Sequence, residues 1–492
     1  SICASYPKAN IWIIPSVESP QVYRNYAQTS KVHLEMARGE VEHIQLVFPS
    51  KVNEEYRFTF DRYLKGIQIS ARELKKMNGY YDALVPFKNQ LKCTDTLTAV
   101  WITVQCPSRV PVGKYHQTIK IEGSKHFTIQ LDYNVHHTTI PLKSSIPITV
   151  GVENRCMTEC LNDKEADKER QRWVDFVLSY RMTPVFGTQI TPERWQYEHS
   201  FSPWAWNDKR SIRLLNDRRY SCYMLPFFTL SENELASLLC NIQKKGKLKE
   251  SLFYMEDYEQ IKRKVNIIRK YASDARILTT FFCGPRNGPR KGDLYAVFDY
   301  LKHHIHVATI SLAPCKGNEE EVQHIRYKVP EGIDWWSYVC WQPGGNEPNF
   351  LLQMKGIQQR AIMWRTWKNG SQGFLYWNCN IYHKRNPFTY ITDMPHGDGI
   401  LIYPGDILGC KGPIASARLE RWRDGAEEME LLRLVEKNYS KEKADTLLNI
   451  VYSSPLSFIE KAHNIPFFRK ELLDQLDKTI PIDYKLRITD FI

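Results

Sequence analysis

The feature that most constrains the fold is an eightfold alternation of strand-like and helix-like segments that begins near residue 145. Apolar runs of strand length alternate there with amphipathic stretches, most of them ten residues or longer. This rhythm is typical of βαβ units with parallel strands, and eight such units predict a (β/α)8 barrel. The predicted strands are Ile146–Val152, Thr183–Phe186, Tyr220–Phe228, Ser251–Met255, Ile277–Phe282, Ala308–Ala313, Trp336–Trp341 and Gly373–Ile381.

Amphipathic stretches follow most of these strands. In the last one, Leu419, Trp422, Ala426 and Met429 recur at helical spacing and predict a buried face. The second repeat is the least regular, since residues 187–219 predict a long loop before any helix. The predicted helices are Glu165–Tyr180, Glu232–Lys244, Tyr258–Ala272, Leu294–His304, Phe350–Trp367 and Ser416–Lys437.

The first 140 residues have a different pattern. Short runs such as Val41–Phe48 and Thr98–Gln105 are apolar or alternate, are separated by Pro, Gly and Asn turns, and show little helical periodicity. This predicts a β-sandwich. We therefore expect a β-sandwich domain over residues 1–142, a (β/α)8 barrel over 143–440 and a C-terminal extension over 441–492 that packs on the other two.

The formal net charge of +12 favours contact with acidic partners, but acidic residues are interleaved through most of the chain. No helix-turn-helix, RNP-like or zinc-finger pattern accompanies the charge, so a mildly basic surface is favoured over a nucleic-acid site. A polyanion-binding module would depend on the charge alone. The sequence contains no apolar run of eighteen residues, and we predict no membrane span.

The cysteine count bears on the compartment. Twelve cysteines is an even number, and secretion would allow pairs such as Cys156 with Cys160 or Cys93 with Cys106. The alternative is a set of buried thiols. No cysteine or histidine cluster has the spacing of a zinc site, so we predict no structural metal.

Two further features favour secretion. The chain begins at Ser1 rather than at methionine, as after removal of a signal peptide. Glycosylation sequons begin at Asn369 and at Asn438. We expect a secreted or lumenal protein.

Two adjacent carboxylates directly follow the fourth predicted strand. In a barrel of this type, reactive groups gather in the loops at the carboxyl ends of the strands, and Glu256 and Asp257 occupy such a position. Neighbouring carboxylates separate each other's pKa values, so one can act as a general acid while the other stays ionised. The alternative is that both acids simply open the next helix, where its dipole favours negative charge.

The last two predicted strands are rich in aromatic and amide side chains. Sugar rings stack their C–H faces on aromatic rings, and their hydroxyls need amide or other polar partners. The alternative for each of these side chains is packing in the barrel interior. The candidate sugar contacts are Tyr338, Trp341, Trp377, Asn378 and Asn380.

The C-terminal half resembles the catalytic domain of glycoside hydrolase family 123. Six separated blocks occur in the expected order, and ARGEVEHIQ at 37–45 is similar to that family's sandwich domain. The resemblance covers roughly residues 10–440. The blocks are EGIDWWSY at 331–338, NF at 349–350, GFLYW at 373–377, GDGILIYPG at 397–405, GPIASARLE at 412–420 and RDGAEE at 423–428.

The resemblance implies a reaction as well as a fold. Family members release terminal β-linked N-acetylgalactosamine with retention, by attack of the sugar's own acetamido oxygen, and need neither a metal nor an organic cofactor. An Asp orients the acetamido group and the Glu after it protonates the leaving oxygen. Here the order is Glu256-Asp257, so Glu256 takes the place of the polarising Asp and Asp257 that of the acid. An alternative alignment places Met255 and Glu256 there.

Two functions remain open at this stage. The first is a glycosidase acting on a glycolipid, glycoprotein or glycosaminoglycan-type glycan through Glu256 and Asp257. The second is a catalytically impaired relative that binds glycans or serves as a structural or interaction protein, which the exchanged acid pair favours. The Gly397 and Gly399 turn is expected to serve the backbone, and the charges from Arg418 to Asp424 are expected to anchor the last helix through ion pairs.

Overall fold

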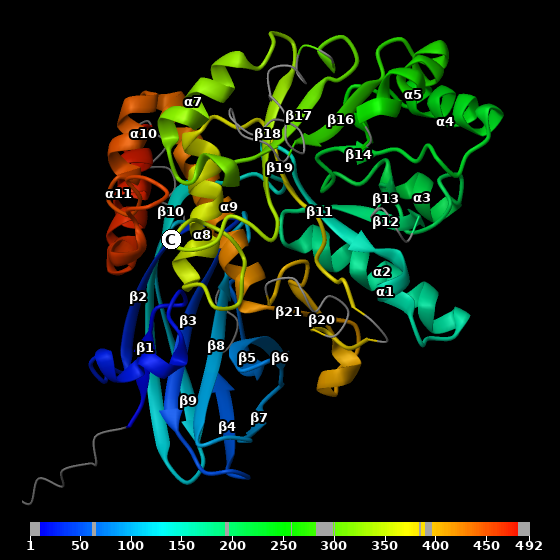
Figure 1. Ribbon diagram of the computed structural model, residues 1–492. Coiled ribbons are helices and arrows are strands. Elements are labelled where there is room, and N and C mark those ends of the chain that lie inside the picture. Colours follow the sequence, from blue (N-terminus) through cyan, green and yellow to red (C-terminus); the bar gives the residue numbers. More distant parts are fainter. Residues whose placement is uncertain are drawn as a thin grey trace, which may run out of the picture.

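The structure is a computed structural model that describes residues 10–61, 65–191, 196–256, 258–281, 299, 301–382, 385–388 and 396–480. Its N-terminal part contains two five-stranded sheets (Figure 1). The first has the order β1 (Trp12–Ile14), β3 (Val41–Pro49), β8 (Leu97–Gln105), β5 (Gln68–Met77) and β6 (Tyr80–Pro86). The second has the order β2 (Lys31–Arg38), β10 (His126–Thr139), β9 (Gly113–Glu122), β4 (Glu55–Phe60) and β7 (Gln90–Lys92).

The two sheets share one apolar core. Along β10, Phe127, Ile129 and Leu131 are buried while the residues between them are exposed. They pack in the same cluster as Leu46 of β3 and Ile102 of β8, which belong to the other sheet. The N-terminal region is therefore the β-rich sandwich that the alternating pattern predicted.

The second region is built on one large sheet with eight parallel strands. Strands that are neighbours in the sheet come from consecutive repeats of the sequence, as in a barrel. The first repeat is joined to the last because β11 pairs with β19. The parallel strands are β12 (Thr183–Thr191), β11 (Ile148–Glu153), β19 (Phe374–Tyr376), β18 (Asp334–Val339), β17 (Val307–Ser311), β16 (Arg276–Phe281), β15 (Ser251–Tyr254) and β14 (Tyr223–Met224).

A ninth strand, β13 (Gln196–Ser200), stands between the second and third repeats. It runs antiparallel to β12, and just beyond it the backbone N–H of Phe201 donates to the carbonyl oxygen of Met224 at 2.7 Å. The sheet is thereby nearly closed into a TIM-type barrel. The loop predicted for residues 187–219 is thus partly a hairpin, followed by the short helix α3 (Lys209–Leu214).

Helices cover the outer face of the barrel sheet (Figure 1). The predicted helix Leu294–His304 lies largely outside the described residues. Two short strands, β20 (Ile402–Pro404) and β21 (Pro413–Ala415), precede the last barrel helix. The helices of this region are α1 (Asn154–Thr158), α2 (Asp163–Ser179), α4 (Glu232–Lys244), α5 (Tyr258–Tyr271), α7 (Glu319–Lys328), α8 (Gly356–Lys368) and α9 (Ala417–Asn438). The same region contains the 3-10 turns η2 (Ala313–Cys315) and η3 (Gly405–Leu408), and η1 (Pro20–Asn25) lies in the N-terminal part. None of the helices in the described part of the chain has the length and apolarity needed to cross a membrane.

The helix α9 lies against the sandwich and is buried over most of its length. Its contact with β3, α8 and the C-terminal helix is an ion-pair network that we call the charged seam. Arg360 binds both oxygens of Glu428 at 2.8 Å, and His43 lies 3.2 Å from Glu420 and 3.1 Å from Asp424. The expectation that the charges of α9 anchor the helix is confirmed. The seam consists of Glu40, Glu42, His43, Arg72, Arg360, Glu420, Arg423, Asp424, Glu428 and Arg469.

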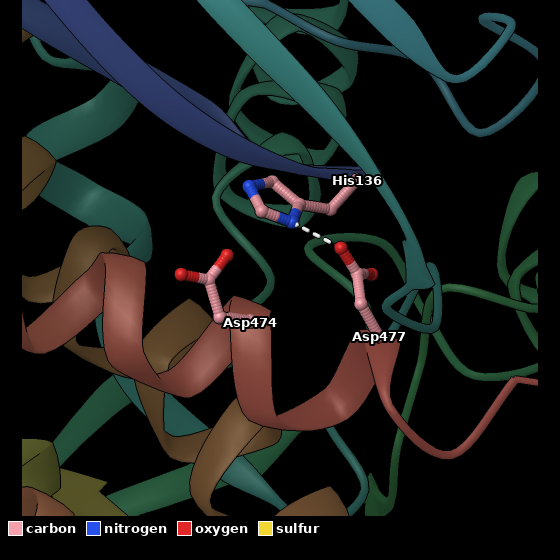
Figure 2. Close-up of side chains that lie close together, drawn as sticks. All are labelled: His136, Asp474 and Asp477. Carbon is pink, nitrogen blue, oxygen red and sulfur yellow. Dashed lines mark hydrogen bonds and ion pairs between the residues drawn. The ribbon is translucent and has the colours of Figure 1, made fainter.

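The C-terminal residues form two helices, α10 (Lys441–Leu448) and α11 (Ile465–Asp477), joined through η4 (Ile459–Asn464). The helix α11 packs on β10 and β2 of the sandwich and on α9. Figure 2 shows one of its polar contacts, in which Nδ1 of His136 lies 2.7 Å from Asp477. Nε2 of the same ring lies 2.6 Å from Glu35 of β2, which the figure does not draw. We call this contact the His136 clip.

Candidate active site

The inner face of the barrel can be traced from the pairing register. Val185 of β12 and Leu375 of β19 belong to the apolar cluster inside the barrel, and they pair with Gly151 and Thr149 of β11. Because side chains alternate along a strand, Thr149, Gly151 and Glu153 all face inward. The carboxyl end of β11 therefore delivers the side chain of Glu153 to the mouth of the barrel.

The same register places a row of residues across three neighbouring strands. Glu153 of β11 pairs with Gly187 of β12, and Gly187 pairs with His199 of β13. Neighbouring strands lie about 4.8 Å apart, so the Cα atoms of Glu153 and His199 are on the order of 10 Å apart. We call these three positions the mouth row.

Glu256 reaches this region from β15. Leu252 and Tyr254 line the inner cluster whereas Met255 packs outward, so alternation turns Glu256 inward. Its Oε1 lies 3.0 Å from Nε2 of His199, and its side chain is 26% exposed. Tyr254 stacks on the His199 ring at a centroid distance of 4.0 Å. The imidazole is thus held on its face by Tyr254 and in turn orients the Glu256 carboxyl.

The second acid of the predicted pair, Asp257, lies outside the described residues. The helix α5 begins at the next position, Tyr258. Glu256 itself does not lie in that helix, and its carboxyl is directed to β13. The choice between a catalytic pair and two acids that only precede a helix stays a prediction.

Glu198, next to His199 but on the other face of β13, holds a neighbouring loop of the mouth in place. Its carboxylate accepts hydrogen bonds from the backbone N–H groups of Phe227 at 2.7 Å, Phe228 at 3.0 Å and Thr229 at 2.5 Å. These residues form the loop that follows β14. A single buried carboxylate therefore fixes the third loop of the mouth relative to the strand that carries His199.

Glu153 is the second carboxyl of the mouth. Its side chain is 3% exposed, and its Oε2 has no hydrogen-bond partner among the described residues. Burial raises the pKa of Glu153 to about 7, an effect that the positive charge of Arg155 only partly offsets. The backbone is fixed by Asn380, whose Oδ1 accepts from the Glu153 N–H at 2.7 Å and whose Nδ2 donates to the Glu153 carbonyl at 3.2 Å.

The predicted sugar contacts have different surroundings. Tyr338 is 8% exposed and belongs to the inner barrel cluster, whereas Trp341, just beyond β18, is 41% exposed. Asn380 is fully buried, and both polar ends of its side chain bind the backbone of Glu153. Asn378 is buried and accepts from the Asn380 N–H at 3.0 Å. The two amides therefore shape the loop after β19, and whether sugar reaches any of these side chains stays a prediction.

Trp377 is held in place by a buried acid. Its Nε1 donates to Asp398 at 2.9 Å, and Tyr376 donates its hydroxyl to the same oxygen at 3.1 Å. Burial raises the pKa of Asp398 to about 6 despite these hydrogen bonds. Gly399 has a φ of +75°, and a Cβ there would lie 2.6 Å from the Trp377 ring. The glycine therefore serves both the turn, as expected, and the close approach of the indole.

Two predictions about surface chemistry need correction. Asn369 has no exposed area, because it ends α8 with both side-chain amide atoms buried, so it cannot carry a glycan in this structure. Asn438 is exposed at the end of α9 and remains a predicted site.

The ten described cysteines are all free, and the Cys156 thiol is directed to the Tyr382 carbonyl at 3.0 Å instead of to Cys160. The expected disulfides are therefore wrong for these residues.

One group of side chains in the described part of the chain has the ligand types and spacing that could hold a metal ion. His136, Asp474 and Asp477 place ligand atoms within 4.8 Å of one another (Figure 2). Burial would lower the pKa of His136, but its hydrogen bonds to Asp477 and Glu35 outweigh burial and raise the pKa to about 9. Asp474 is paired with Lys470. This group is occupied as a set of ion pairs, and a metal would have to displace a firmly held proton.

A hollow of about 860 Å³ between α3 and α4 contains none of the predicted site residues. It is bordered by Trp206 and Ile212 on one side and by Cys240 and Lys244 on the other. It lies on the outer helical layer, whereas reactive groups in barrels of this type sit at the carboxyl ends of the strands. The mouth row and Glu256 are therefore the candidate active site.

The comparisons with known proteins agree with this architecture. The family model for the catalytic domain of glycoside hydrolase 123 matches residues 168–435, just over half of the chain. The fold and this match define a glycoside hydrolase. The chain belongs to glycoside hydrolase family 123. A search among curated proteins finds no match.

Solved structures were also found to be similar, and the first of them has the same fold. A family 123 glycoside hydrolase from Clostridium perfringens, studied for glycolipid glycan hydrolysis, is similar over 98% of this chain and 100% of its own, with 13% identity and a TM-score of 0.65. A GH5 xyloglucanase from Bacteroides ovatus has 8% identity and a TM-score of 0.29, over 80% of this chain and 98% of its own. Xylanase 10C from Cellvibrio japonicus has 12% identity and a TM-score of 0.30, over 78% and 91%.

Proposed function

We propose that this chain releases terminal β-linked N-acetylgalactosamine from glycans by a retaining, substrate-assisted mechanism. The observation that carries the proposal is the inward-facing Glu256 carboxyl at the carboxyl end of β15, held by His199 and Tyr254. Family membership supports the reaction class. Adjacent carboxylates at that position supply the two functions that such a reaction needs.

In this reaction the acetamido oxygen of the substrate forms a bond to the anomeric carbon while the bond to the leaving oxygen breaks. Glu256 takes the place of the Asp that polarises the acetamido group. Its carboxylate accepts a hydrogen bond from the acetamido N–H, which increases the negative charge on the attacking oxygen. Asp257 takes the position of the acid that gives its proton to the leaving oxygen. Water then attacks the anomeric carbon from the face that the leaving group vacated, returns a proton to the acid and restores both the acetamide and the β configuration.

The hydrogen bond from β13 gives Glu256 a fixed direction. Relative to an Asp at the same position, a Glu carboxyl lies one methylene further from the backbone, and misplacement on the order of 1 Å can cost about a hundredfold in rate. Nε2 of His199 is hydrogen-bonded to one oxygen of the Glu256 carboxyl at 3.0 Å, and this contact limits rotation of the carboxyl. We propose that this contact compensates for the exchanged order of the acid pair.

The first test is turnover of an aryl β-N-acetylgalactosaminide, beside the gluco epimer. Glu256→Gln should lower kcat/KM by about 100-fold or more, because the variant no longer offers a carboxylate to the acetamido group. Asp257→Asn should have an effect of similar size if it supplies the proton. A thiazoline analogue of N-acetylgalactosamine should inhibit the wild-type protein.

The matched control is Glu250→Gln, an exposed glutamate just before the amino end of the same strand, β15. It should keep wild-type turnover and thermal stability. Binding of N-acetylgalactosamine without any hydrolysis by the wild-type protein would favour the second function, a glycan-binding relative that has lost catalysis. The exchanged Glu256-Asp257 order is the observation in favour of that alternative.

For the natural substrate class, the Clostridium perfringens relative provides the starting point. Because that enzyme was studied for glycolipid glycan hydrolysis, we propose a glycolipid ending in β-linked N-acetylgalactosamine as the first natural glycan to test, before glycoprotein and glycosaminoglycan-type glycans. Secretion stays a prediction, to be checked by locating the protein in fractionated cells.

A further inference from the structure

We infer that Glu153 is a substrate-binding residue of this barrel, whose carboxyl receives a ring hydroxyl of the terminal sugar. The inference rests on the proposed function, because it names a second contact of the same site. The sequence did not single out Glu153, and the reaction described above does not use it.

The position of Glu153 is the first argument. It is the last residue of β11, faces inward, and shares the mouth row with His199, the partner of Glu256. In barrels of this type the carboxyl ends of different strands contribute the groups that contact substrate. Glu153 and Glu256 therefore approach the mouth from two strands on either side of β12 and β13.

The surroundings of Glu153 are the second argument. Its Oε2 is buried and lacks a hydrogen-bond partner among the described residues, and a buried polar atom of this kind needs an explanation. Glu40, Glu42 and Asp424 of the charged seam also have carboxyl oxygens without a hydrogen-bond partner there. Asn380 fixes the backbone from which the Glu153 side chain extends. In contrast, the buried acids of the charged seam, such as Glu428, all have cationic partners.

The aromatic ring in the mouth row is the third argument. Gly187, the middle member of the row, has no side chain, and the Tyr197 ring lies over it, with Cδ1 3.3 Å from where a Gly187 Cβ would be. A carboxyl beside an aromatic ring is a combination that suits a sugar, whose hydroxyls need polar partners and whose C–H faces need apolar ones. The raised pKa of Glu153 means that the group can donate as well as accept near neutral pH.

The test uses Glu153→Gln in the full chain, assayed on the aryl galactosaminide and by calorimetry with N-acetylgalactosamine and its thiazoline analogue. We expect KM to rise about tenfold or more with a smaller change in kcat, and the affinity for both ligands to fall by a similar factor. Glu153→Asp, which keeps the charge but withdraws the carboxyl by one methylene, should show the same loss. Glu159→Gln, on the loop after α1 and outside the mouth row, is the matched control and should behave as the wild type.

The outcomes separate this inference from the proposed function. If the wild type hydrolyses the substrate and both Glu153 variants keep its KM and ligand affinity, the inference is wrong and the proposed function stands. If the wild type binds N-acetylgalactosamine without hydrolysing it, and the variants lose that binding, the inference stands and the hydrolase proposal fails. A wild type that neither binds nor hydrolyses the sugar overturns both.

Discussion

Two regions of this molecule bury carboxylates, and they differ in the cations that contact those carboxylates. In the charged seam, Glu420 lies within ion-pair distance of Arg72, Arg423 and His43, and although burial would raise its pKa, these cations hold the pKa well below the usual range. Burial raises the pKa of Glu42 in the same seam to about 7, although Arg360 and Arg469 lie within ion-pair distance of it. At the barrel mouth, burial likewise raises the pKa of Glu153 to about 7, but no ion pair joins Glu153 to a cation among the described residues. Buried acids that share cations belong to a structural joint, whereas a buried acid without an ion pair at a barrel mouth is a candidate contact for substrate.

The largest effect is expected in the seam. Arg360→Leu removes the guanidinium that binds Glu428 in two places and also faces Glu42 and Asp424. Because it leaves buried carboxylates without a cation, we expect a loss of about 3–5 kcal/mol in the free energy of unfolding, measured by urea denaturation. The control is Lys270→Met at the exposed Lys270–Glu232 pair, which should leave the urea midpoint unchanged. A small loss in Arg360→Leu would mean that the seam is not a joint.

The His136 clip should make the attachment of α11 sensitive to pH. The pKa of His136 is raised from 6.5 to about 9, so its contribution is fully present below pH 6.5 and is lost as the pH rises through 9. Hydrogen bonds from His136 and His33 outweigh burial and lower the pKa of Glu35 to about 2, so its contribution is present above pH 4.5 and is lost as the pH falls through 2. The melting temperature of the wild type should exceed that of His136→Asn most between about pH 4.5 and 6.5, by the equivalent of about 1–3 kcal/mol.

This difference should shrink at pH 9 and above. A gap between the two melting curves that stays constant from pH 5 to pH 10 would contradict the assignment of a charged imidazole at the clip.

At the mouth, His199 is expected to act by positioning Glu256. His199→Ala should lower kcat/KM about tenfold, because the carboxyl regains rotational freedom, with little change in melting temperature. His199→Gln, whose amide nitrogen can donate to the same carboxylate oxygen, should recover part of the loss. Unchanged kinetics in His199→Ala would mean that His199 does not position Glu256 for the reaction.

The sequence predicted the architecture better than the site. Apolar runs bounded by turn residues located the eight parallel strands, and the stripe from Leu419 to Met429 located α9. The strand β13 escaped prediction because Gln196-Tyr197-Glu198-His199-Ser200 is polar and forms part of a hairpin at the rim. The contacts of Glu198 and His199 are with residues far away in the sequence, the loop after β14 and Glu256. Their roles could therefore not be predicted from the local pattern.

Glu153 could have been found. It follows the predicted strand Ile146–Val152 directly, as Glu256 follows Ser251–Met255, and the same argument from the carboxyl ends of barrel strands applies to both. What the sequence could not show is its burial without a partner, which depends on Asn380 and on the register with Gly187. The burial of Asn369 could not be predicted either, because a sequon consists of three residues and contains no information on how the end of a helix packs.

The central claim is that Glu256 and the mouth row form one sugar-binding site. It is tested most directly by a crystal structure with the thiazoline analogue of N-acetylgalactosamine bound. We expect the thiazoline nitrogen within about 3 Å of a Glu256 carboxyl oxygen, with a ring hydroxyl at hydrogen-bond distance from Glu153. A ligand bound elsewhere on the chain, with Glu256 still engaged only by His199, would contradict the account.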